Sequence, residues 1–173
     1  MNITPVHITV GKLAEGFEDR ATGGVTACAG ELDVRPEYQR EFVYEPKERD
    51  AVLRTVMCGL PLNVMYWVDR GAGEHPRYEV MDGQQRTISL CGYVNGDFTV
   101  DERGFANLEA DEQQRILDYE LMVYVCSGTD SEKLDWFQTI NVAGKPLVKQ
   151  ELRNAVYHGS FVARAKEYFS RAG

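Results

Sequence analysis

The spacing of hydrophobic residues predicts helices and strands that alternate along most of the chain. Apolar residues in 52–60 recur at intervals of three or four and follow a proline suited to a first helical turn, so a helix is predicted from Pro46 to about Leu60. The apolar run Leu121–Cys126 is typical of a buried strand, which we expect over Tyr119–Cys126. Further strands are expected over 3–10, 62–68, 77–81 and 98–100, and further helices near 12–19 and over 108–119.

The remaining segments predict turns and a helical C-terminal part. Residues 21–30 are rich in Gly, Thr and Ala, which favours turns, and 31–44 mixes strand and turn signals. After the last strand, Asp130 or Ser131 is expected to cap a further helix. Two more helices are expected over 149–158 and 160–171. We therefore expect one α+β domain over 1–144, followed by a helical extension over 145–173.

Composition excludes several classes of protein. Hydrophobic residues make up 43% and charged residues 27% of the 173 residues, as in ordinary globular proteins. No apolar run approaches the ~20 residues of a membrane-spanning helix, and no basic region precedes an apolar stretch at the N-terminus. We therefore expect a cytoplasmic protein without membrane contact. The four cysteines are far apart, so no metal site is expected, and Cys58, Cys91 and Cys126 are interpreted as small core residues.

The charge is acidic overall and uneven along the chain. The net charge of −8 opposes a general attraction to nucleic acid, because non-specific binding depends on neutralising phosphates. Residues 145–173, however, carry an excess of basic side chains. Any contact with DNA is therefore expected to be local.

The residues Asp82-Gly83-Gln84-Gln85-Arg86 form the most distinctive local pattern. They lie where a predicted strand ends and a predicted helix begins. A helix start offers unpaired N–H groups to an anion, glycine allows close approach of a phosphate, and arginine adds a fixed charge. The sequence alone favours a structural interpretation, in which Asp82 caps the helix and Gln85 completes a capping box.

Two other segments contain candidate binding residues. In 35–44, Gln39 and Arg40 lie among aromatic residues and could bind a base or a phosphate by stacking and hydrogen bonding. The alternative is an edge strand in which Arg40 pairs with an acidic side chain. In 137–147, Asn141 and Gly144 are typical of a helix end, so the sequence alone favours a structural turn there over a binding role.

The order of these segments resembles the N-terminal domain of GmrSD-type and SspE-type restriction proteins, a ParB/sulfiredoxin-like family. The resemblance extends from about Val34 to Gly159. The chain departs from the family pattern at two places: Tyr44 replaces a common tryptophan, and Ile88-Ser89-Leu90 replaces a Leu-Thr-Thr-Leu type of run. Both departures are mild, because neither touches the expected phosphate-binding residues. The segments that carry the resemblance are Tyr38-Gln39-Arg40, Met81–Thr87, Phe137–Asn141 and Glu151–Ala155.

The resemblance implies a small mixed sheet with flanking helices that binds a nucleoside triphosphate and hydrolyses it. Mg²⁺ is expected with the nucleotide from phosphate chemistry generally, although the sequence shows no dedicated cage for it. The implied catalytic residues are Asp82, Gln85 and Arg86. The implied nucleotide contacts are Gly83, Gln84, Gln85, Arg86, Thr87, Arg40 and Asn141. The implied DNA contacts are Tyr38, Gln39 and Arg40.

The resemblance also implies partners. In such proteins nucleotide turnover is coupled to recognition of modified DNA, and a separate C-terminal domain cuts, so we expect a nuclease domain or subunit as a partner. Pairing with another copy of the chain is a further possibility. The competing hypothesis is a module that binds DNA or protein without hydrolysis and regulates a nuclease partner.

Overall fold

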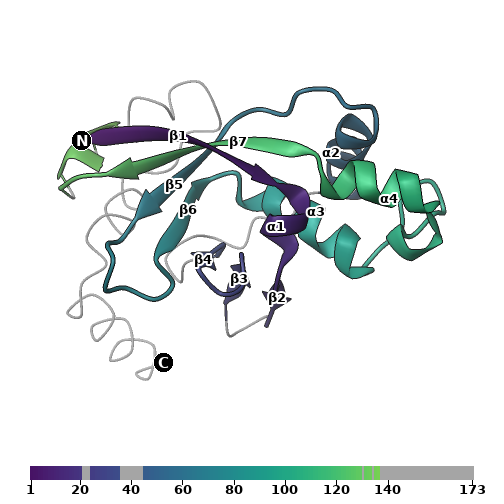
Figure 1. Cartoon of the computed structure of the whole chain (residues 1–173), viewed down its shortest axis with the longest axis horizontal. Helices are drawn as coiled ribbons and strands as arrows, with labels where there is room; N and C mark the ends of the chain where they lie inside the picture. The colour runs from purple at the N-terminus through teal and green to yellow at the C-terminus, as the bar shows by residue number, and fades with distance from the viewer. Residues whose placement is uncertain (21–23, 36–44, 130, 134, 137–173) are drawn as a thin grey trace, which may run out of the picture. The chain divides into compact units, whose positions relative to one another are not determined.

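The computed structural model describes residues 1–20, 24–35, 45–129, 131–133 and 135–136. The described strands form one seven-stranded mixed sheet in the order β1-β7-β5-β6-β4-β3-β2, which confirms the expected α+β class (Figure 1). The strands are β1 Asn2–Thr9, β2 Glu18–Asp19, β3 Val25–Ala27, β4 Leu32–Asp33, β5 Met65–Asp69, β6 Tyr78–Asp82 and β7 Glu120–Ser127. The helices are α1 Val10–Ala14, α2 Pro46–Met57, α3 Gln84–Asn95, α4 Ala110–Leu117 and the 3₁₀ helix η1 Phe105–Asn107.

The strands β5 and β6 lie inside the sheet and carry the elements that matter most below. β5 runs parallel to β7 and antiparallel to β6, and β6 runs parallel to β4. The short strands β4, β3 and β2 continue the sheet with antiparallel pairing. β6 is followed directly by α3, so its last residues and the first turn of α3 lie at one end of an interior strand.

The hydrophobic core is formed by side chains of the described helices together with side chains from one face of the sheet. Met65 and Trp67 of β5 and Val123 of β7 are each at most 4% exposed. They belong to one buried cluster with Leu53 of α2 and Leu90 of α3. Since side chains alternate along a strand, the residues between them on β5 and β7 lie on the opposite face.

Local signals account for the helix that was predicted most clearly. Pro46 occupies the first turn of α2, where the missing N–H of proline has no cost. Glu45 and Glu48 exchange hydrogen bonds as a capping box. The helix ends at Met57, and Cys58 at its C-cap is exposed, so the interpretation of Cys58 as a core residue is wrong; Cys91 and Cys126 are buried as expected.

Three other sequence expectations differ from the structure. The helix expected near 12–19 is instead α1, because the Thr9 side chain accepts a hydrogen bond from the Lys12 N–H and fixes an earlier start. The strand expected over 62–68 begins only at Met65. The segment 98–100 forms no strand, since Val100 makes only an isolated bridge to Arg103.

The C-terminal expectations are only partly within the described residues. Residues 131–133 and 135–136 are helical, and Thr129 caps this turn: its hydroxyl accepts from the Glu132 N–H at 3.4 Å, and the Glu132 carboxylate accepts from the Thr129 N–H at 2.9 Å. The helices expected over 149–158 and 160–171, and the domain boundary at 144, lie outside the described residues. No helix in the described part of the chain is long and apolar enough to cross a membrane.

Candidate functional site

The junction between β6 and α3 is built around Gly83, within the compact unit formed by Ile3–Pro36 and Glu41–Cys126. Gly83 is the N-cap of α3 and has a φ of 104°, a left-handed conformation that L side chains rarely adopt. A Cβ at this position would lie 2.7 Å from Cγ and 2.8 Å from Sδ of Met65. Both the backbone conformation and the close packing on β5 therefore require glycine.

No side chain among the described residues caps α3. The structural interpretation of Asp82 and Gln85 as a capping box is therefore wrong, because Gly83 takes the N-cap position and Asp82 remains the last residue of β6. The first N–H groups of an α-helix have no partners within the helix and carry its positive dipole end. This helix start has the properties of an anion-binding site.

Arg86, in the first turn of α3, reaches back to the end of β6 and to the segment before β5. Its Nη2 donates to Asp82 Oδ2 at 2.7 Å, while Nη1 donates to the carbonyl oxygens of Asn63 and Val64, the latter at 3.1 Å. The Arg86 side chain is 12% exposed and that of Asp82 is 55% exposed. Arg86 thus fastens three chain segments together. Its Nε–H and second Nη2 hydrogen have no partner among the described residues.

The other predicted residues of this motif take different positions. Gln84 Nε2 is buried and has no hydrogen-bond partner within the described part of the chain. The Gln85 carbonyl accepts from Ser89 Oγ at 2.7 Å. Thr87 is fully buried, and its hydroxyl lies 3.5 Å from Met65 Sδ, so its side chain packs into the core beneath the junction.

The remaining predicted residues are not placed with this junction. Arg40, Tyr38, Gln39 and Asn141 lie outside the described residues, so their predicted roles stay predictions. Sequence reasoning missed Tyr66 on β5, whose antiparallel partner is Asp82. Only the alternation along β5, which puts Met65 and Trp67 in the core, could have placed Tyr66 on the outer face beside the motif.

Neither metal nor thiol chemistry is indicated in the described part of the chain. No group of three His, Cys, Asp or Glu side chains is arranged to hold a metal ion there. Burial raises the pKa of the Cys28 thiol to about 12 and that of Cys126 to about 11. These cysteines stay protonated near neutral pH and are poor nucleophiles.

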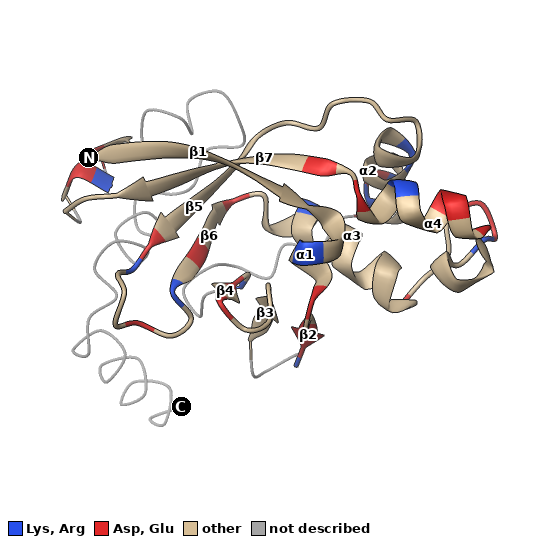
Figure 2. Cartoon of the chain, in the orientation of Figure 1, with Lys and Arg blue, Asp and Glu red and all other residues tan. Residues whose placement is uncertain are grey.

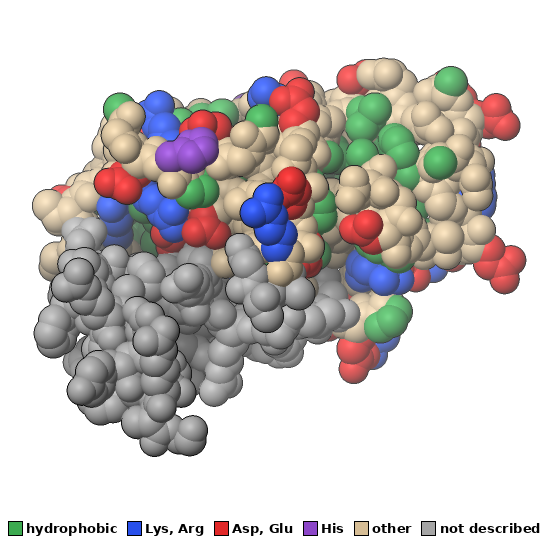
Figure 3. Space-filling model, turned by 90° about the horizontal axis from the view of Figure 1, so that it is seen from below, with side chains coloured by type: hydrophobic (Ala, Val, Ile, Leu, Met, Phe, Trp, Pro, Cys, Tyr) green, Lys and Arg blue, Asp and Glu red, His purple; other side chains and the backbone are tan. Residues whose placement is uncertain are grey.

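The basic side chains in the described regions are paired with acidic ones. Every lysine and arginine within 1–20, 24–35 and 45–129 forms an ion pair with a carboxylate. Arg70, for example, contacts Asp33 at 2.8 Å and Glu79 at 2.6 Å. Figure 2 shows basic and acidic segments close together at the ends of β5 and β6 and along α4. In the space-filling view of one face, red and blue side chains likewise lie side by side (Figure 3). The basic segment 145–173 lies outside the described residues.

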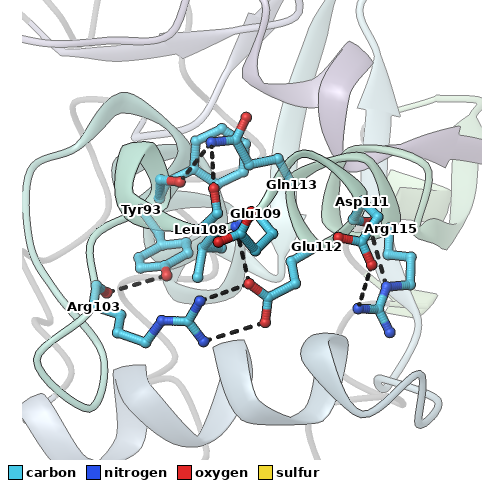
Figure 4. Close-up of polar contacts among 9 residues, drawn as sticks. Tyr93, Arg103, Leu108, Glu109, Asp111, Glu112, Gln113 and Arg115 are labelled. Carbon is cyan, nitrogen blue, oxygen red and sulfur yellow. Dashed lines mark hydrogen bonds and ion pairs between the residues drawn. The ribbon is translucent and has the colours of Figure 1, made fainter.

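A cavity of about 150 Å³ lies among α2, α3 and α4 and shares no residue with the β6–α3 junction. Figure 4 shows Arg103 and Glu112 facing each other at its rim, joined by hydrogen bonds of 2.6 and 3.2 Å. The Tyr93 hydroxyl donates to the Arg103 carbonyl at 3.2 Å. These contacts hold the loop before η1 against α4. The cavity is lined by Met57, Tyr93, Val100, Asp101, Arg103, Leu108, Glu112, Arg115 and Ile116.

The Arg103–Glu112 pair predicts a pH-dependent contribution to stability. The hydrogen bond from Arg103, together with that from the Glu109 N–H, lowers the pKa of Glu112 below its usual value near 4.5. A carboxylate with a lowered folded-state pKa stabilises the fold above its unfolded pKa, and this contribution is lost as the pH falls through the folded value. We expect Glu112→Gln, which can keep the α4 capping box, to lower the melting temperature at pH 7. This difference should shrink as the pH falls below the ordinary glutamate value of about 4.3 and through the lowered pKa of Glu112.

The matched control is Asp111→Asn, on the same helix turn. Asp111 pairs with Arg115 at 3.3 Å, and both side chains are well exposed. Exposed pairs of this kind contribute little, so Asp111→Asn should change the melting temperature only slightly at any pH. A difference between wild type and Glu112→Gln that is the same at pH 3 and pH 7 would contradict the role given to the charge of Glu112.

The comparison with known families covers the junction and most of the chain. Residues 24–158 match the model of the GmrSD restriction endonuclease N-terminal domain. No curated protein and no solved structure matches the chain significantly. The family match includes the Asp82–Arg86 motif and the strands and helices that position it. The chain therefore belongs to the family of GmrSD restriction endonuclease N-terminal domains, which places it among restriction and phage-defence proteins.

Proposed function

We propose that this chain binds a nucleoside triphosphate, with the phosphates at the β6–α3 junction and Mg²⁺ bound together with them. The observation that carries this proposal is the uncapped start of α3 at the left-handed Gly83. Its N–H groups and dipole favour an anion, and glycine keeps a side chain from blocking the approach. Membership of a restriction family gives a nucleotide-dependent role its biological setting.

The hydrogen-bonding capacity of the junction fits phosphate oxygens, which accept but do not donate. Arg86 keeps two N–H groups that no described residue accepts, although Asp82 and two carbonyls hold its guanidinium in place. Gln84 Nε2 is a buried donor without an acceptor in the described part of the chain. A buried donor left unpaired is costly, and a phosphate oxygen would satisfy it.

Mg²⁺ fits the junction only as a companion of the phosphates. The described residues contain no protein cage for a metal, and Asp82 is the carboxylate at the junction. Mg²⁺ in nucleotide sites is typically held by one or two carboxylates, waters and the phosphates themselves. When bound, it would supply charge neutralisation at the phosphates, and Asp82, at 55% exposure, would hold it or one of its waters.

We extend the proposal to hydrolysis of the triphosphate. Arg86 would stabilise charge on the transferring phosphoryl group, as a held cation can without reorganising. Gln85 and Asp82 would position the attacking water. In the whole system, turnover would be coupled to recognition of modified DNA through Tyr38, Gln39 and Arg40, and a nuclease domain or subunit would cut.

A module that binds DNA phosphates at this junction without hydrolysis is the competing function. It is disfavoured by the pairing of every cation within 1–20, 24–35 and 45–129 with a carboxylate. DNA-binding surfaces usually present unpaired Lys and Arg to several phosphates. A single triphosphate makes a smaller demand on basic side chains.

Calorimetric titration of the purified chain with the four ribonucleoside triphosphates, with and without Mg²⁺, tests the proposal. We expect the chain to bind a triphosphate more tightly in the presence of Mg²⁺. We also expect it to release phosphate from the bound triphosphate, which is measured with and without modified DNA. Binding without phosphate release, even with modified DNA, would limit the function to nucleotide sensing. Binding of duplex DNA together with no heat from any triphosphate would favour the competing module.

A further inference from the structure

Two tyrosines lie beside the junction on the sheet face opposite the helices. Tyr66 of β5 is the antiparallel partner of Asp82 on β6 and the parallel partner of Tyr124 on β7. Paired residues on neighbouring strands point to the same face of a sheet. The order Tyr124, Tyr66, Asp82 therefore forms one row across three adjacent strands, and Arg86 is joined to its end by the 2.7 Å contact with Asp82.

The two rings are stacked along this row. Their centroids are 5.7 Å apart and their planes differ by 20°. Both side chains are half-buried, so the pair is neither part of the core nor fully solvated. Their neighbours Met65, Trp67 and Val123 point to the other face and join the core cluster, whereas the tyrosines are not part of it.

An irregularity in the sheet accompanies this placement. The β5–β6 register shifts between Tyr66 and Trp67, because Tyr66 pairs with Asp82 while Trp67 pairs with Val80. Such bulges re-aim side chains and are common next to functional sites. Here the bulge brings Tyr66 opposite Asp82 and keeps Trp67 in the core.

Tyr66 lies within the electrostatic influence of the charged residues of the junction. Burial raises the pKa of the Tyr66 hydroxyl, Tyr124 and Asp82 raise it further, and the positive charge of Arg86 opposes them. Adjacent strands are about 4.8 Å apart, so the row from Tyr124 to Asp82 spans roughly 10 Å. A nucleotide needs a span of this order between its base and its outer phosphates.

We propose that the stacked rings of Tyr66 and Tyr124 bind the base of the nucleoside triphosphate whose phosphates lie at Gly83–Arg86. This proposal rests on the proposed function. It adds a base-binding subsite, which would let the protein distinguish a nucleotide from free polyphosphate. Aromatic rings bind any base by stacking, because every base presents a π-face. The site therefore accepts several bases and favours purines, whose larger rings stack over more area.

Replacing each tyrosine with leucine or with phenylalanine tests this subsite. Leucine keeps an apolar side chain of strand-compatible size but removes the ring, whereas phenylalanine keeps the ring. The affinities of wild type, Tyr124→Leu, Tyr66→Leu and the two phenylalanine variants are measured by calorimetry for ATP, GTP and inorganic tripolyphosphate. We expect the leucine variants to lose roughly 5- to 100-fold in affinity for ATP and GTP and to bind tripolyphosphate as wild type does. The phenylalanine variants should bind all three ligands nearly as wild type does.

The matched control is Tyr78→Leu. Tyr78 is a half-buried tyrosine of β6, but it packs toward the core, with its ring centroid 6.1 Å from that of Trp67. Tyr78→Leu alters packing within the same sheet but leaves Tyr124, Tyr66 and Asp82 unchanged. We expect Tyr78→Leu to lower the melting temperature and to leave the ratio of ATP to tripolyphosphate affinity unchanged.

The outcomes separate failure of the subsite from failure of the proposed function. Wild type that binds ATP no more tightly than tripolyphosphate, or leucine variants that weaken both ligands equally, would overturn the base subsite while leaving the phosphate site standing. Leucine variants with normal ATP affinity but impaired DNA binding would overturn it in favour of a DNA base. Wild type that binds neither ATP nor tripolyphosphate would overturn the proposed function and the subsite together.

Discussion

Gly83→Ala is expected to destabilise the domain by about 2–5 kcal/mol, because two separate costs add at this position. A left-handed backbone costs an L side chain about 1–2 kcal/mol, and Gly83 has a φ of 104°. The new Cβ would also lie 2.7 Å from Met65 Cγ and 3.0 Å from Met65 Cβ. Met65 is fully buried and cannot move aside freely, and overpacking of this kind costs about 1–3 kcal/mol.

The control for this prediction is Gly96→Ala, at the other end of the same helix. Gly96 is the C-cap of α3 and has a φ of 86°, but nothing lies within 4 Å of a Cβ built there. Gly96→Ala should therefore show only the backbone cost of about 1–2 kcal/mol. Denaturant unfolding of the two variants measures the difference. Equal destabilisation by both would show that the close approach of Gly83 to Met65 is relaxed at no cost.

The elements that sequence analysis predicted well are those with local signals. The helix at Pro46 and the strand ending near Cys126 were predicted from a proline and from an unbroken apolar run. The strand-to-helix change at Asp82–Gly83 was predicted from the glycine within one residue of its position. Such signals act within a few residues, so they can be read without knowing the fold.

The contacts that shape the site are long-range and could not be read in this way. Arg86 binds the Asn63 and Val64 carbonyls, 23 and 22 residues away in the chain. The Tyr66–Tyr124 stack depends on the parallel register of β5 and β7. The motif alone favours a capping box over an anion site, because it does not reveal that Gly83 itself takes the N-cap.

The other large effect is expected for Arg86→Ala, which should reduce both triphosphate affinity and stability. The sequence alone suggests a charge whose removal leaves the fold intact. In the structure, however, the guanidinium also donates to two backbone carbonyls and to Asp82. Water can replace the donor at the exposed Asn63 carbonyl, but the Val64 carbonyl is partly buried. Leaving a buried acceptor without a donor costs about 1–3 kcal/mol, which corresponds to a melting temperature lower by about 2–12 °C in a chain of this size. The Asp82 side chain is 55% exposed, so water can replace the hydrogen bond that it accepts from Arg86, and losing that bond adds little to the cost.

The loss of affinity is separated from the loss of stability by measuring each directly. Below the melting temperature of the variant, we expect Arg86→Ala to bind both ATP and tripolyphosphate about 10- to 100-fold more weakly, since a hydrogen bond to a charged group contributes about 1.5–3 kcal/mol. Arg86→Lys keeps the charge, but its donors all leave one nitrogen, whereas Arg86 uses Nη1 for the two carbonyls and Nη2 for Asp82. The lysine variant should therefore recover part of the affinity and less of the stability. Arg115→Ala removes an exposed arginine from α4 and should change neither quantity appreciably. A folded Arg86→Ala protein with wild-type affinity for tripolyphosphate would mean that Arg86 only fastens the junction, and the phosphates would have to be placed elsewhere.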